Sequence, residues 1–136
     1  MPARPPTILL LTAVAGLGLL ACAHGPTASA DVALGMEFTL APGESALAGD
    51  AGLRVSFESV TEDSRCPMDA LCIQAGRVVV AVTAGRHQAR SFSLSPGDAA
   101  VTDGHRLTLV RVEPYPSAAE PIPASAYRAT FVVVRS

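Results

Sequence analysis

The sequence has no lysine, so arginine supplies all ten basic side chains, and it has no tryptophan, four phenylalanines and two tyrosines. There is no basic run that could follow a phosphate backbone, which argues against nucleic acid as a partner. The phenylalanines are needed for a core. Tyr127 falls in a predicted strand, so Tyr115, between two prolines, is the one aromatic side chain left that could stack on a sugar ring.

Local signatures of catalysis are also absent. No G-x-S-x-G elbow or comparable arrangement of a nucleophile with its base occurs in the chain. Paired carboxylates for glycoside hydrolysis form in space, so a sequence does not exclude them. We therefore expect a protein that is not an enzyme and that needs no cofactor.

The N-terminal segment has the pattern of a secretory signal peptide. Arg4 is followed by an uncharged, mainly apolar run from Thr7 to Ala21, which ends among small residues at Cys22. A membrane-spanning helix needs roughly 20 apolar residues, and this run is shorter. We expect residues 1–21 to be removed from the mature protein.

The end of this segment reads Leu19, Leu20, Ala21, Cys22. It resembles the lipobox of bacterial lipoproteins, in which a signal peptidase cuts before the cysteine and a diacylglycerol is attached to its sulfur. The resemblance implies a lipid anchor on Cys22 that holds the protein at the periplasmic face of a membrane of the cell envelope. Ala23 favours the outer membrane, because retention in the inner membrane often shows Asp at that place. The alternative is ordinary secretory cleavage that leaves a free thiol.

Residues 22–33 would then form the lipidated cysteine and a flexible tether, since they are small, lack periodicity and include Gly25 and Pro26. Residues 34–136 have the length of one domain with a modest core, and no second domain fits.

The remaining cysteines, Cys66 and Cys72, form an even pair in a compartment where disulfides persist. We expect them to be bonded to each other, closing a small loop. The alternative is a zinc site, which requires four ligands at tighter spacings, whereas His87 and His105 are distant in the sequence.

Period-two alternation dominates the domain. Leu53, Val55 and Phe57 alternate with Arg54 and Ser56, as in a half-buried strand. Turn signals separate such runs, which predicts an all-β fold, a single small β-sandwich or barrel-like domain. The expected strands are residues 36–41, 53–57, 77–83, 88–94, 106–112 and 127–134, with a seventh if residues 45–48 pair.

Two further features follow from the pattern. Residues 77–83 and 88–94 read as a hairpin that turns at Ala84-Gly85, and the apolar stretch 78–80 indicates a central strand. Residues 114–126 contain four prolines, which are not tolerated in a central strand, so we expect a loop there.

The most distinctive segment runs Glu62-Asp63-Ser64-Arg65-Cys66-Pro67 and continues to Cys72 and Ala75-Gly76. It resembles a D-S-R-C-P segment, followed by C and then A-G, in uncharacterised small bacterial lipoproteins and secreted proteins. Those relatives often carry Trp before the Ala-Gly, where this chain has Gln74. The resemblance implies a shared all-β domain and offers no activity to carry over.

This segment has two interpretations. It is either a structural corner, with Arg65 paired to Asp63 or Glu62 and the disulfide fixing the loop, or a rigid loop presented to a partner. A rigid loop loses less entropy on docking, which suits recognition and also protease inhibition through residues 65–71. The candidate binding residues are Asp63, Arg65, Pro67, Asp69 and Tyr115.

Metal binding is a weaker alternative. Calcium takes six to eight oxygen ligands, and carboxylates cluster in and near this segment, but their spacing matches no EF-hand loop. Copper has soft ligand types available, although they are scattered singly. The calcium candidates are Glu58, Glu62, Asp63 and Asp69, and the copper candidates are His24, Met36, Met68, His87 and His105.

The sequence thus predicts a lipid-anchored extracytoplasmic β-sandwich that binds or supports something in the cell envelope without catalysing a reaction. The expected partners are the membrane, through the anchor, and an envelope protein. A metal-binding protein and a protease inhibitor that uses the disulfide loop are the alternatives.

Overall fold

The structure is a computed structural model, and it describes residues 2–3, 29–50 and 52–136. Apart from residues 2 and 3, the predicted signal peptide lies outside the described residues, as do Cys22, His24 and the tether up to residue 28. Within the described part of the chain, no helix has the length and apolar character needed to cross a membrane.

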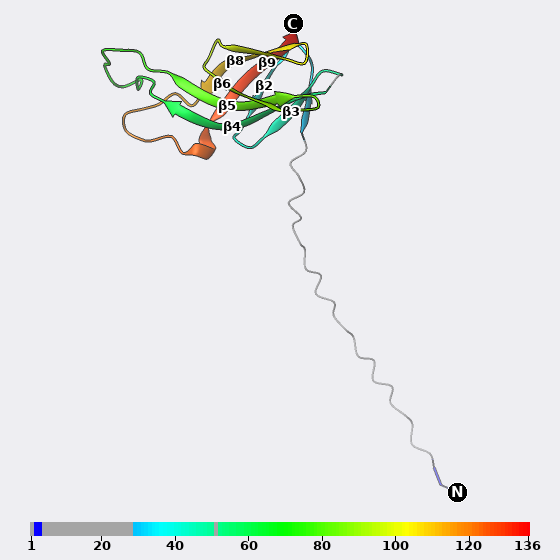
Figure 1. The fold of residues 1–136 in the computed structure, drawn as a ribbon. Coiled ribbons are helices and arrows are strands. Elements are labelled where there is room, and N and C mark those ends of the chain that lie inside the picture. Colours follow the sequence, from blue (N-terminus) through cyan, green and yellow to red (C-terminus); the bar gives the residue numbers. More distant parts are fainter. Residues whose placement is uncertain (1, 4–28, 51) are drawn as a thin grey trace.

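The described residues form two sheets that pack as a β-sandwich (Figure 1). The first sheet has the strand order β1-β3-β4-β5-β6, with β1 (Ala30–Val32), β3 (Ser45–Ala48), β4 (Leu53–Asp63), β5 (Val78–Gly85) and β6 (Arg90–Leu94). The second has the order β2-β9-β8-β7, with β2 (Glu37–Leu40), β9 (Arg128–Arg135), β8 (His105–Glu113) and β7 (Ala99–Thr102). The prediction of an all-β sandwich is confirmed.

The core lies between the sheets and is built from the alternating apolar positions of the strands. Leu53, Val55 and Phe57 of β4 are buried, as predicted. Phe131 of β9 is fully buried, with its ring centroid 5.9 Å from that of Phe38 on β2 and 6.4 Å from that of Phe57. This aromatic cluster joins the two sheets and sits in the range where ring pairs attract each other.

The predicted hairpin is present, since β5 and β6 pair antiparallel from Val80↔Leu94 to Ala84↔Arg90. Its turn differs from the prediction, because Ala84 and Gly85 still belong to β5. A Cβ at Gly85 would overlap the Gln88 carbonyl, so glycine allows the close approach there. β5 lies between β4 and β6, which confirms it as an interior strand.

Three elements differ from the sequence expectation. Residues Ala30–Val32, placed in the tether by the sequence, form β1 and pair in parallel with β3. The strand β7 was not predicted, because Ala99–Thr102 is only four residues long and lies between two turn signals. β4 continues six residues past Phe57, to Asp63. The sequence did not predict this extension, because register shifts between Phe57 and Ser59 and between Val60 and Glu62 interrupt the alternation of buried and exposed residues.

The long β4–β5 ladder positions the loop of interest. Asp63, the last residue of β4, pairs with Val78, the first residue of β5, so the chain between them leaves one end of the sandwich. β8 and β9 close in the same way with Glu113 opposite Arg128, and the loop between them leaves beside the first. The two loops are the green and orange segments at the left of Figure 1.

Candidate functional site

Two loops form one end of the sandwich, and most of the candidate binding residues lie there. We call residues 64–77 the disulfide loop and residues 114–127 the proline loop, and the surface they share the two-loop end. The proline loop is irregular except for a short 3-10 turn, η1 (Ala124–Ala126), as its four prolines predict. The geometry of this end decides which candidate residues are structural and which are presented to solvent.

The disulfide loop is closed at two levels. Cys66 and Cys72 are bonded, with 5.9 Å between their Cα atoms, which confirms the predicted disulfide. At the base, the Ser64 N–H donates to the Arg77 carbonyl at 2.8 Å, and the Arg77 N–H donates to Ser64 Oγ at 3.1 Å. A Cβ at Gly76 would overlap the Ser64 carbonyl, so the two halves of the loop approach closely only because glycine stands there.

Arg65 ties the disulfide loop to the end of β8. Its Nε and Nη2 donate to the two oxygens of Asp63 at 2.8 and 2.6 Å, a two-pronged ion pair whose side chains are only 7% and 10% exposed. The same guanidinium donates to the carbonyls of Val112 at 2.9 Å and Pro114 at 3.0 Å. Such a bidentate pair is both strong and directional. The sequence left open whether Arg65 pairs with Asp63 or Glu62, and the partner is Asp63.

The carboxylate of Asp63 also accepts a hydrogen bond from the Tyr127 hydroxyl at 2.9 Å. Hydrogen bonding from Arg65 lowers the pKa of Asp63 below its ordinary value, and the Tyr127 hydrogen bond adds to this, against the opposing effect of burial. The hydrogen bond to Asp63 raises the pKa of Arg65. Both groups therefore stay charged at neutral pH. Together they form a fixed cross-link between the end of β4, the end of β8 and Tyr127, the residue before β9.

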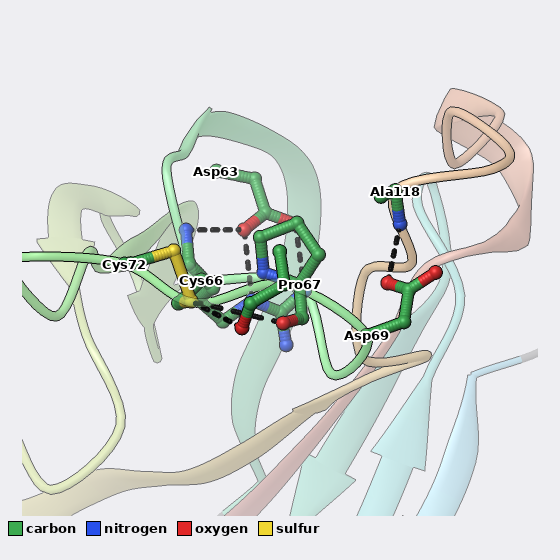
Figure 2. The surroundings of a disulfide bond; sticks show 8 residues. Asp63, Cys66, Pro67, Asp69, Cys72 and Ala118 are labelled. Carbon is green, nitrogen blue, oxygen red and sulfur yellow. Dashed lines mark hydrogen bonds and ion pairs between the residues drawn. A yellow bond between two sulfur atoms is a disulfide. The ribbon is translucent and has the colours of Figure 1, made fainter.

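Pro67 and Asp69 hold the far part of the disulfide loop. The Ala70 N–H donates to the Pro67 carbonyl at 3.1 Å, which makes a turn. Asp69 Oδ1 accepts from the Ala118 N–H at 2.7 Å, and Figure 2 shows this carboxylate reaching across to the proline loop. The Met68 N–H donates to the Pro116 carbonyl at 3.1 Å. These contacts and those of Arg65 join residues 65–69 of the disulfide loop to the first residues of the proline loop, up to Ala118.

Three large apolar side chains of the disulfide loop are exposed. Leu71 and Ile73 are as exposed as in an extended chain, at 104% each, and Met68 is 74% exposed. We call these three side chains the apolar tip. Leu71 and Ile73 flank Cys72, whose side chain is turned into the disulfide. Isolated exposed aliphatic residues need no explanation, but three of them within six residues of a cross-linked loop indicate a contact surface.

Tyr115, on the proline loop, lies against the guanidinium of Arg65. The guanidinium carbon of Arg65 lies 4.9 Å from the centroid of the Tyr115 ring, within the range of a cation–π contact. The ring is 49% exposed, so it covers Arg65 on one side and remains accessible on the other. This position is compatible with two roles for Tyr115, covering the end of the sandwich and contacting a partner.

The four carboxylates considered for calcium have separate partners. Glu58 accepts from Thr83 Oγ1 at 3.0 Å and Glu62 pairs with Arg77 at 3.0 Å, while Asp63 and Asp69 make the contacts described above. In residues 2–3, 29–50 and 52–136, no group of three or more His, Cys, Asp or Glu side chains is placed to hold a metal ion. Among the copper candidates, Met36 and His87 are exposed, and His105 is buried with Nδ1 2.8 Å from the Asp103 carbonyl.

Of the residues chosen from the sequence, Asp63 and Arg65 lie inside the cross-link, Pro67 and Asp69 support the loop, and Tyr115 is half exposed. Sequence reasoning included Leu71 only as the end of the range 65–71 and missed Ile73. These two are the most exposed large hydrophobic side chains of this end. One sequence signal could have indicated their exposure. Leu71 and Ile73 flank Cys72, and when the cysteine side chain turns into a disulfide, the side chains of its two neighbours can face solvent.

No family of known proteins, no curated protein and no solved structure matches this chain. Its function therefore has to be inferred from the residues of the two-loop end and from the sequence that precedes the domain.

Replacing both Cys66 and Cys72 with serine should lower the free energy of unfolding by about 2 kcal/mol. The disulfide closes a loop with a sequence separation of only 6, and a short loop removes little entropy from the unfolded chain. Urea denaturation of the oxidised protein and the double variant measures the difference, and the reduced wild-type protein serves as the control. A loss well above 4 kcal/mol would contradict a local role, because the ion pair and the loop-to-loop hydrogen bonds would then depend on the disulfide.

Proposed function

We propose that the protein is a lipid-anchored, extracytoplasmic binding module that holds an envelope protein through the two-loop end and catalyses no reaction. The observation that carries this proposal is the apolar tip on a rigid frame, with Leu71 and Ile73 fully exposed next to the Cys66–Cys72 disulfide. The module works without a cofactor and without nucleic acid.

The chemistry of the tip suits protein recognition. Burying a leucine or isoleucine side chain against a partner contributes about 1.5–3 kcal/mol each. Asp69 and Arg65 already hold the disulfide loop in place before a partner binds. Little conformational entropy is therefore lost on docking, which strengthens binding. Tyr115 enlarges the surface with an aromatic ring, a residue type that is enriched in the cores of interfaces.

The proposed anchor lies in the N-terminal segment, before the domain. Residues 1–21 would be removed as a signal peptide, Cys22 would carry the acyl chains, and the residues after it would tether the domain to the periplasmic face of the membrane, with the outer membrane favoured. Each buried methylene of an acyl chain contributes about 0.8 kcal/mol, so two or three chains hold the protein stably without a membrane-spanning helix.

The two-loop end lies far from Ala30, where the proposed tether would join the domain. Ala30, the first residue of β1, pairs with Ala46 of β3, and Ala46 pairs with Val55 of β4. Asp63 lies eight residues farther along β4, a distance of about 26 Å at roughly 3.3 Å per residue. The two-loop end is therefore accessible to a partner while the opposite part of the domain stays near its tether.

In-cell photo-crosslinking tests the proposal. A photo-reactive amino acid at Ile73 should give one discrete crosslinked species with an envelope protein, which mass spectrometry then identifies. The same probe at Val101 is the matched control, because this β7 side chain is also exposed, at 50%, but lies on the other sheet. Equal crosslinking from both positions, or none from Ile73, would refute the two-loop end as the binding surface.

A further inference from the structure

We propose that the partner of the apolar tip is the substrate cleft of a serine protease with an apolar specificity pocket, and that Leu71 fills this pocket. The inference rests on the proposed function, because it names the partner class of the same surface. It narrows the sequence expectation of protease inhibition through residues 65–71 to one residue and one class of specificity pocket.

The exposure of the side chains selects the residue. A protease pocket takes in a whole side chain, and Leu71 presents its entire side chain to solvent. Of the two arginines in this loop, Arg65 is only 7% exposed and makes four side-chain hydrogen bonds inside the protein. Arg77 is 69% exposed, but it lies at the base of the loop, outside the ring that Cys66 and Cys72 close, and pairs with Glu62. The accessible residue is therefore apolar, and the proposed protease has an apolar pocket.

Fixed groups hold Leu71 on both sides. Ala70 before it ends the turn that starts at Pro67, and Cys72 after it is bonded to Cys66. Asp69 anchors the turn to the proline loop through the Ala118 N–H. Inhibitory loops bind tightly because they are already ordered before docking, and their backbones move little on binding.

The position of the Leu71–Cys72 peptide bond explains why such a loop would inhibit and not simply be cut. The protease serine Oγ would bond to the Leu71 carbonyl carbon as the bond to the Cys72 nitrogen breaks, and the protease histidine would pass the serine proton to that nitrogen. The new amine of Cys72 stays in place, because the disulfide holds it to Cys66 and β5 holds the following chain to β4.

A tethered amine reacts with the acyl-enzyme at a high effective concentration, so it restores the peptide bond faster than water completes hydrolysis. The bond lies inside the ring that the disulfide closes, since Leu71 is between Cys66 and Cys72. Cleavage after Ile73 would fall outside this ring. This difference favours Leu71 over Ile73 as the residue that fills the pocket.

Inhibition assays with the purified protein test the inference. Chymotrypsin and subtilisin, which accept apolar side chains, should be inhibited, whereas trypsin should not. Leu71→Asp should weaken inhibition about 10–100-fold, the loss expected for one large apolar side chain in a pocket. Val101→Asp, at an exposed strand position outside the two loops, should leave inhibition unchanged. Leu71→Arg should transfer inhibition to trypsin.

Rapid cleavage of the Leu71–Cys72 bond without inhibition would overturn the inference, as would inhibition that the Leu71 variants do not affect. The proposed function fails separately, by the absence of a crosslink from Ile73. A crosslinked envelope protein that is not a protease, together with no inhibition of chymotrypsin or subtilisin, would leave the binding module standing and refute the protease partner.

Discussion

Arg65→Ala is expected to lower the free energy of unfolding by about 3 kcal/mol. The substitution leaves the Asp63 carboxylate without its cation at a site where it is only 10% exposed, and it removes the donors to the carbonyls of Val112 and Pro114. Removing one partner of a buried pair typically costs about 3–5 kcal/mol. The lower end of that range applies, because this pair lies under a loop and not in the centre of the core.

Urea denaturation at neutral pH measures the loss, and Arg77→Ala is the matched control. Arg77 also pairs with a carboxylate of β4, but its side chain is 69% exposed and that of Glu62 is 41% exposed. Exposed ion pairs contribute little, so this variant should unfold at nearly the wild-type urea concentration. Equal losses in the two variants would contradict a special role for the buried pair.

The acid limb of the stability curve provides a second readout of the same pair. The pKa of Asp63 is lower in the folded protein than its ordinary value, chiefly through hydrogen bonding from Arg65. The resulting stabilisation is present above the carboxyl's ordinary pKa, near 4, and is lost as the pH falls through the lower folded value. In Arg65→Ala this part of the pH dependence should flatten, whereas a loss of packing alone would shift the curve without changing its shape.

Cys22→Ser is expected to release nearly all of the protein from membranes. If the cysteine is the acylated residue, its loss removes every acyl chain, and with them the roughly 0.8 kcal/mol that each buried methylene contributes. Cell fractionation followed by an alkaline carbonate wash of the membranes measures the attached fraction. The Cys66→Ser, Cys72→Ser double variant should remain attached, which separates the anchor from the disulfide. A Cys22→Ser protein that stays in the membrane fraction would refute the anchor.

The strands of both sheets were largely predictable, because one face of each strand is buried and apolar residues therefore occur at every second position. Leu53, Val55 and Phe57 show the pattern and are buried, so β4 was found from its first residue. Its second half was missed because bulges break the alternation after Phe57. β1 and β7 were missed for a different reason, since strands of three and four residues are too short to establish a period.

The two-loop end was predictable only in part. The Cys66–Cys72 bond follows from counting cysteines, and pairing of Arg65 with a nearby carboxylate follows from charge. The contacts of Arg65 with Val112 and Pro114 span 47 and 49 residues, and no local pattern encodes such distances. The exposure of Leu71 and Ile73 depends on where the loop lies relative to the rest of the domain, so it also required the structure.

The full exposure of Leu71 and Ile73 has a consequence for how this domain can change over generations. The side chains that hold the loop in place, Arg65 and Asp69, are separate from the side chains that face outward. A substitution at an outward position removes no internal contact, and such surface changes usually alter stability by less than about 0.5 kcal/mol. If the two-loop end binds a partner, as proposed, single mutations at the outward positions would change the partner without a cost in folding stability. Related chains would then share the same loop scaffold and recognise different targets.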